Sequence, residues 1–193
     1  MKEIRHKTLL PNYDIFDEYR YFEPNKSFEI IEVSGFRIAL TICEDLWNVG
    51  NNPLYTVNPM DEMIVQKPDM IINIAASPFN YNQHKMRAEV LQENAKKYRL
   101  PLFYVNHVGA QTELLFDGGS LVIDPTGEIL HELKYFEEDY RVFDTEDLHL
   151  YKSSRQISVY PDGKEKIGLI HDALVMGVKN YFEKLGFSKA ILG

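Results

Sequence analysis

The sequence of 193 residues contains one cysteine and has fewer basic than acidic residues. A single cysteine excludes a disulfide within the chain and any cysteine-rich zinc site. Lys and Arg number 21 against 29 Asp and Glu, which gives a formal net charge of −8. A protein that binds a nucleic-acid backbone needs a basic surface, so we expect no nucleic-acid partner.

Long apolar runs are also lacking. No run approaches the roughly 18 residues of a membrane span, and no signal-peptide core follows the first residues. We therefore expect a cytoplasmic protein with no membrane partner. Metal-ligand spacings such as His-x-x-x-His are absent, as is a glycine-rich phosphate loop followed by a helix. Hydrophobic residues still make up 45% of the chain, enough for one good-sized core.

Apolar runs and amphipathic segments alternate along much of the chain. The patterns predict strands over 28–33, 36–42, 70–75 and 101–108, and helices over 59–66 and 83–99. This alternation is typical of an α/β layered fold. Shorter strands over 121–123, 128–133 and 140–143 are predicted to form an antiparallel flank.

The last fifty residues differ from the rest. Residues 144–164 are polar and irregular, which indicates a linker or an extended arm. A long amphipathic helix is predicted over 166–185, with Gly186 as its C-cap. Its apolar face is expected to consist of Ile167, Ile170, Leu174, Val178, Tyr181 and Leu185. Residues 189–193 look like the start of a buried strand, so we expect the sequence to be a piece of a longer chain.

Cys43 is a candidate nucleophile because it directly follows an apolar strand. A lone cysteine is more often a small core residue, but Glu44 and Asp45 make its surroundings polar. A rigid strand fixes the sulfur, and backbone N–H groups that follow it can stabilise an oxyanion. Asp45 is expected to orient nearby backbone N–H groups, and Trp47 to pack.

Four segments carry a more specific signal. They are KTLLPNY at 7–13 with FDEYRYF at 16–22, RIALTICEDLW at 37–47, NIAASPF at 73–79, and FDGGS at 116–120 with DPTG at 124–127. Together they resemble the carbon–nitrogen hydrolase (nitrilase) superfamily and, more narrowly, the glutaminase domain of the glutamine-dependent NAD+ synthetases.

The resemblance implies a nitrilase-like α-β-β-α sandwich that is incomplete at its N-terminus. Residues 1–145 would be the C-terminal part of the glutaminase domain, 146–165 a linker or arm, and 166–193 the start of an ATP-dependent synthetase domain. The resemblance implies no cofactor in this segment, and ATP and magnesium in the synthetase domain of the same polypeptide. A homo-oligomer is expected, because nitrilase-type sheets pair across helices.

The resemblance also implies a reaction. Cys43 would attack the side-chain amide of L-glutamine to form a thioester, with Lys7 stabilising the oxyanion, and the ammonia would serve NAD+ synthesis from nicotinate adenine dinucleotide. The family's general-base glutamate lies N-terminal to the lysine, and neither Glu18 nor Glu44 matches it. We therefore expect this chain alone to be inactive.

Four residues would recognise the substrate. Glu44 would pair with the α-ammonium group of glutamine and Lys85 with its α-carboxylate, while Tyr13 and Ser77 would add hydrogen bonds. Each has an ordinary structural alternative: Tyr13 could pack, Ser77 could cap a turn, and Lys85 could be a solvated helix residue. Arg87 competes with Lys85 for the carboxylate.

Two other functions stay open on the sequence alone. One is a free-standing nitrilase-family amidase that acts on another amide. The other is a non-enzymatic pseudo-amidase module that keeps the fold without the general base. The flanking gene sequence on both sides would distinguish them.

Overall fold

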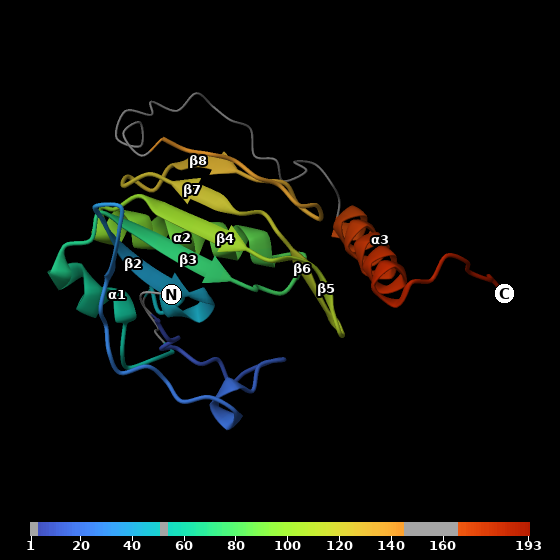
Figure 1. The fold of residues 1–193 in the computed structure, drawn as a ribbon, viewed down its shortest axis with the longest axis horizontal. Helices are drawn as coiled ribbons and strands as arrows, with labels where there is room; N and C mark the ends of the chain where they lie inside the picture. Colours follow the sequence, from blue (N-terminus) through green and yellow to red (C-terminus); the bar gives the residue numbers. More distant parts are fainter. Residues whose placement is uncertain (1–3, 51–53, 145–165) are drawn as a thin grey trace.

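A six-stranded mixed sheet organises the part of the chain that the computed structural model describes, which is residues 4–50, 54–144 and 166–193. The strand order is β1-β2-β3-β4-β7-β8 (Figure 1). The three central strands are parallel and comprise β2 (Phe36–Ile42), β3 (Met70–Ala75) and β4 (Leu102–Asn106). The antiparallel strands are β1 (Ile31–Val33), β7 (Leu121–Ile123) and β8 (Ile129–Glu132).

The main core lies between one face of this sheet and helix α2 (Gln83–Tyr98), which is behind the sheet in Figure 1. Leu91 and Ala95 of α2 pack with sheet residues such as Ile71 and Leu102, and all four are at most 1% exposed. The shorter helix α1 (Pro59–Met63) continues as the 3-10 helix η3 (Ile64–Gln66) and completes this layer. Asn58 caps α1 by accepting a hydrogen bond from the Met60 N–H at 3.1 Å.

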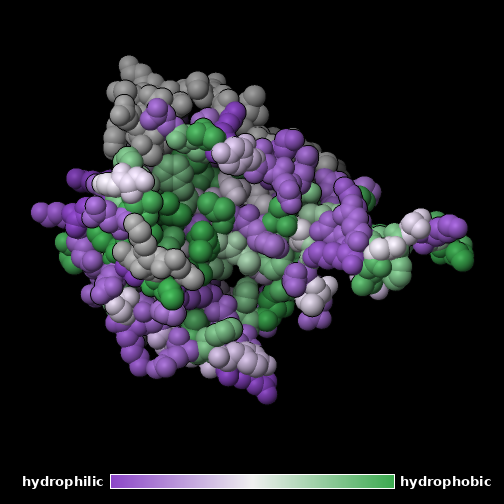
Figure 2. Space-filling model, viewed as in Figure 1, coloured by the Kyte–Doolittle hydropathy of each residue, from purple (hydrophilic) through white to green (hydrophobic). Residues whose placement is uncertain are grey.

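The opposite face of the sheet is apolar and partly open. Strand register places Leu40 beside Ile72, and Ile42, Ile74 and Val105 in one row. Ile74 is 44% exposed and Val105 51%, and Figure 2 shows apolar side chains gathered over the centre of this face. Among the described residues, the six-stranded sheet therefore carries a helix layer on one face only.

A separate hairpin joins the sheet to the last helix. The hairpin consists of β5 (Val108–Gln111) and β6 (Leu114–Asp117), and helix α3 (Lys166–Leu185) packs against it (Figure 1). Asn180 accepts a hydrogen bond from the Ala110 N–H at 2.9 Å. Gly177 permits this close approach, because a Cβ there would lie 2.9 Å from Leu115.

The structure confirms most of the elements predicted from the sequence. The strands at 36–42, 70–75 and 121–123 and the helix at 166–185 have the predicted bounds. The face of α3 that packs is different, however: Leu169, Ala173 and Met176 are buried. Most of the expected apolar stripe is exposed, because Gly177 and Asn180 determine how α3 meets the hairpin.

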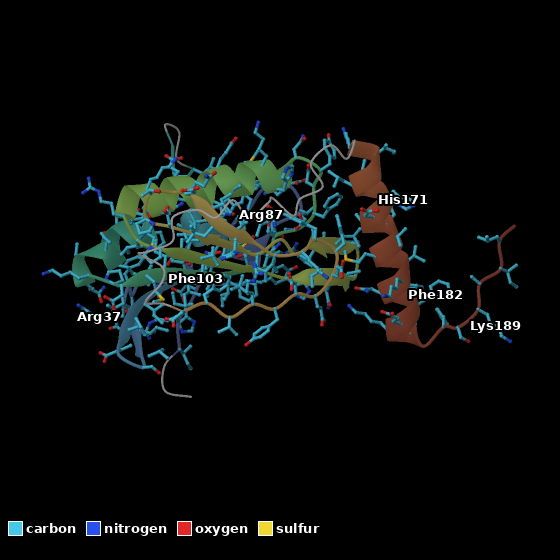
Figure 3. All side chains as sticks on the ribbon, turned by 90° about the horizontal axis from the view of Figure 1, so that it is seen from above. Arg37, Arg87, Phe103, His171, Phe182 and Lys189 are labelled. Carbon is cyan, nitrogen blue, oxygen red and sulfur yellow. The ribbon has the colours of Figure 1, made fainter. Side chains whose placement is uncertain are left out.

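Two predicted strands are wrong, and the first strand is shorter than predicted. Residues 140–143 form no strand, because Phe143 packs on Phe103, with ring centroids 6.2 Å apart, instead of pairing its backbone with an edge strand. Residues 189–193 are exposed and extended, and Figure 3 shows Lys189 well away from the rest of the described chain. The first strand begins only at Ile31, because the side chain of Gln66 binds the backbone of 28–30.

The hairpin β5–β6 was not predicted as a separate unit. The expected strand over 101–108 ends at Asn106, and the next strand starts a new pairing. The predicted linker over 146–165 lies outside the described residues. The division of the chain into a glutaminase part and the start of a synthetase domain therefore stays a prediction.

Candidate active site

Cys43 lies where the central strand β2 ends and the 3-10 helix η2 (Cys43–Leu46) begins. Its φ of 47° is in the left-handed region, which costs a non-glycine residue on the order of 1–3 kcal/mol. The chain therefore turns sharply at the sulfur-bearing residue. The carboxyl ends of parallel strands are where open α/β sheets bind ligands, so this position suits a nucleophile.

Asp45 holds this turn in place. Its 3% exposed side chain accepts hydrogen bonds from the N–H groups of Thr8 and Leu9, at 2.9 and 2.8 Å, and of Ile42 at 3.0 Å. Burial raises the pKa of this carboxyl, while the three N–H donors oppose the rise. Asp45 thus ties the segment that carries Lys7 to the turn that carries Cys43, as the sequence analysis expected.

The Cys43 thiol is largely buried. Burial raises its pKa above the ordinary value, the positive charge of Lys7 opposes the rise, and the carboxylates of Glu44 and Glu18 reinforce it. The resting thiol is therefore protonated at neutral pH. Because the thiolate is the nucleophile, a base must take this proton during reaction.

Lys7 is held by a carboxylate. Its Nζ donates to both carboxylate oxygens of Glu18 at 2.7 Å, and the two side chains are 16% and 24% exposed. Both residues line a cavity of about 390 Å³ together with Cys43. The structure therefore brings the two predicted catalytic residues, Cys43 and Lys7, to one cavity.

Glu44 is 4% exposed and accepts two phenol hydrogen bonds on the same oxygen. Tyr13 donates to its Oε1 at 2.8 Å and Tyr55 at 3.0 Å. Burial raises the pKa of Glu44, and both phenols oppose that rise. The pKa values of Tyr13 and Tyr55 are raised in turn, first by burial and then by the charge of Glu44.

Cys43 also lines a second cavity, of about 360 Å³, which is lined by three of the four predicted substrate residues. These are Tyr13, Glu44 and Ser77. Two more carboxylates, Asp14 and Glu113, also line it, and none of the described lining residues is Lys, Arg or His. The negative charge of this cavity suits a substrate with an ammonium group.

Ser77 is positioned by the end of the neighbouring strand. Its backbone N–H donates to Asn106 Oδ1 at 3.0 Å, and the residue is 4% exposed. Asn106 in turn donates to the Gly118 carbonyl at 2.7 Å. The ends of β3 and β4 thus fix one wall of the 360 Å³ cavity.

The structure separates the two candidates for the α-carboxylate. Arg87 is 1% exposed and lies between α2 and the sheet (Figure 3), where its Nη2 binds both oxygens of Asp117 at 3.0 and 2.9 Å. Its charge is therefore used within the fold. Lys85 is exposed and does not line the 360 Å³ cavity, so its role in substrate binding stays a prediction.

Sequence reasoning missed several residues of the site. Tyr55, Asn80, Gln83 and Glu113 contact Glu44 or line the cavity but belong to loops or to the first turn of a helix. No periodicity marks them. Gln83 precedes Lys85 by two positions on α2, and this offset places its side chain at the cavity.

The described residues offer no metal site, since no group of three or more His, Cys, Asp or Glu among them could hold an ion. A search of the same residues for a helix long and apolar enough to cross a bilayer also found none.

This arrangement is that of a candidate cysteine-dependent hydrolase site, and the chain belongs to the carbon–nitrogen hydrolase family, whose model matches residues 2–152. It is similar to the glutamine-dependent NAD(+) synthetase of Synechocystis sp., with 37% identity over 100% of this chain and 35% of that protein. The corresponding protein of Acinetobacter baylyi is 33% identical over 98% of this chain and 33% of its own length. The chain thus spans about a third of these relatives.

Solved structures give the same picture. The glutamine-dependent NAD+ synthetase of Acinetobacter baumannii, in complex with ADP, has a TM-score of 0.78 and 32% identity over 94% of this chain and 32% of its own. A carbon-nitrogen hydrolase from Helicobacter pylori has a TM-score of 0.59 and 25% identity over 68% of this chain and 48% of its own. The nitrilase-like α/β fold and the family resemblance are therefore confirmed.

Proposed function

We propose that this chain carries the nucleophile of a glutaminase, which releases ammonia from L-glutamine for NAD+ synthesis within a longer polypeptide. The observation that carries the proposal is the left-handed turn at Cys43, a residue that lines both the cavity with Lys7 and the cavity with Glu44. The similarity to glutamine-dependent NAD(+) synthetases over the whole chain supports the choice of substrate.

The reaction proceeds through two steps at Cys43. In the first, the sulfur attacks the side-chain amide carbon, the thiol proton passes to a base, and the carbonyl oxygen becomes an oxyanion. The positive charge of Lys7 stabilises that oxyanion. The amide nitrogen then takes up a proton and leaves as ammonia, which gives a thioester. In the second, water attacks the thioester, and glutamate and the thiol are released.

Substrate recognition follows the charge of the 360 Å³ cavity. Glu44 pairs with the α-ammonium group, and Tyr13 and Ser77 add hydrogen bonds. For the α-carboxylate, Lys85 remains the candidate from sequence, while Gln83 and Asn80 offer neutral amide donors that already line the cavity.

The rest of the proposed enzyme lies outside the described chain. The family's general-base glutamate is expected N-terminal to Lys7, and ATP and magnesium are expected to bind in the synthetase domain. Assembly into a homo-oligomer and a cytoplasmic location stay predictions from the sequence, as does inactivity of this chain alone.

The test uses the full-length polypeptide that contains this chain. A glutamine-mimicking diazoketone should alkylate Cys43, and Cys43→Ala should abolish glutamine hydrolysis because no other nucleophile is available at the turn. Formation of NAD+ from added ammonia should survive in the same variant, which shows that the protein is folded. Glutamine hydrolysis that persists in Cys43→Ala would refute the proposal.

A further inference from the structure

Glu44 has an asymmetric set of hydrogen bonds. Both phenols donate to Oε1, and no described residue donates to Oε2. A carboxylate can accept about four hydrogen bonds through its two oxygens, and Glu44 lines the 360 Å³ cavity. The second oxygen is therefore available to a substrate in that cavity.

The two phenols reach Glu44 from different places. Tyr13 comes from the segment that carries Lys7, is 43% exposed and itself lines the 360 Å³ cavity. Tyr55 comes from the loop before α1 and does not line that cavity. Tyr13 can therefore contact both substrate and Glu44, whereas Tyr55 can affect the substrate only through Glu44.

The Tyr55 loop is held firmly by one buried amide. The side chain of Asn48, which is 8% exposed, accepts from the Tyr55 N–H at 3.1 Å and donates to the carbonyls of Tyr55 and Val57 at 3.0 Å. Asn58 Nδ2 donates to the Asn48 carbonyl at 3.2 Å and so connects this clamp to the cap of α1. The backbone that carries the Tyr55 phenol is therefore anchored by hydrogen bonds to the Asn48 side chain.

We propose that Tyr55 is a positioning residue for the substrate ammonium group: its hydroxyl fixes Glu44 through Oε1 so that Oε2 faces the cavity. This inference rests on the proposed glutaminase function and deepens it. Without this hydrogen bond to Oε1, Oε2 is no longer held toward the cavity. Loss of the hydroxyl should therefore weaken binding of an α-ammonium group without changing the chemistry at Cys43.

The experiment compares two substrates in the full-length enzyme, glutamine and its analogue without the α-amino group, glutaric acid monoamide. With Tyr55→Phe, KM for glutamine should rise roughly tenfold, the size expected for a lost hydrogen bond to a charged group. The kcat for glutamine and both constants for the analogue should stay at the wild-type values. Tyr21→Phe, which removes a phenol from a 70% exposed residue, is the matched control and should change nothing.

Two further measurements, an alkylation rate and a double variant, keep the test independent of folding. Iodoacetamide has no ammonium group, so its rate of reaction with Cys43 should be the same in Tyr55→Phe and the wild type. In a Glu44→Gln background, adding Tyr55→Phe should have no further effect on KM. An unchanged KM for glutamine, or an equal change for both substrates, would overturn the inference. A wild-type enzyme that does not hydrolyse glutamine would instead overturn the proposed function itself.

Discussion

Two charged clusters lie near the ends of the parallel strands, and their polar atoms face different surroundings. In one, Arg87 and Asp117 pair at 2.9 Å with side chains 2% and 1% exposed, and Asn106 binds the same carboxylate. In the other, Cys43 and Glu44 are also buried or nearly so, but both line a cavity. Burial alone therefore does not mark the reactive cluster.

The two clusters differ in whether their charged atoms already have partners within the fold. Arg87 donates through Nη1 to the Gly118 carbonyl and through Nη2 to Asp117, so its role is to hold β6 and α2 together. Glu44 keeps one carboxylate oxygen without a described donor, next to the partly buried Cys43. A buried ion pair whose two charges meet within the fold supports structure, whereas a buried carboxylate that lines a cavity can bind substrate.

The largest effect should come from breaking the buried pair of Arg87 and Asp117. Arg87→Met leaves Asp117 as an unpaired buried charge, which should cost about 3–5 kcal/mol of stability. The measurement is the midpoint of urea unfolding of the full-length protein. Lys26→Met is the matched control, since its pair with Glu23 is 79% and 81% exposed, and it should cost at most about 1 kcal/mol. An unfolding midpoint that does not move, together with lost glutamine binding, would show instead that Arg87 is a substrate ligand.

In the cluster around Cys43, charge changes should alter the reactivity of the thiol. Lys7→Met removes the charge that opposes the raised pKa of Cys43, so the pH profile of alkylation by iodoacetamide should move to higher pH. A shift of one pH unit changes the thiolate fraction about tenfold below the pKa. Glu18→Gln removes a charge that raises this pKa, so its profile should move to lower pH.

The double variant Lys7→Met/Glu18→Gln serves as the control for this pair. Since it removes both opposite charges, its profile should lie between those of the single variants. Profiles that move in the same direction for both single variants would contradict the electrostatic account of Cys43.

The smallest effect is expected from Gln83, which lines the 360 Å³ cavity. Gln83→Ala should raise KM for glutamine several-fold, because an ordinary hydrogen bond from a neutral amide contributes about 0.5–1.5 kcal/mol net. Lys85→Ala is the matched variant on the same turn of α2. If Lys85→Ala raises KM and Gln83→Ala does not, the assignment from the sequence is correct and Lys85 reaches the substrate in the complex.

Much of the fold could be predicted because its signals are local. The run over 36–42 is apolar enough to be a strand regardless of its neighbours, and α3 carries both a helical repeat and a C-terminal glycine. The predicted strand over 140–143 failed because a strand also needs a partner, and Phe143 packs by its side chain instead. Similarly, which face of α3 packs was decided by the hairpin it meets.

By itself, the sequence determined the family, the candidate nucleophile and the positions of the central strands along the chain, because these depend on short motifs and apolar periodicity. Only the tertiary structure decided that Arg87 is bound to Asp117, that Tyr55 binds Glu44, and that Lys85 lies away from the cavity. These partners are 11 to 30 positions apart in sequence. Contacts over such separations arise when strands and loops are brought together, and no local pattern encodes them.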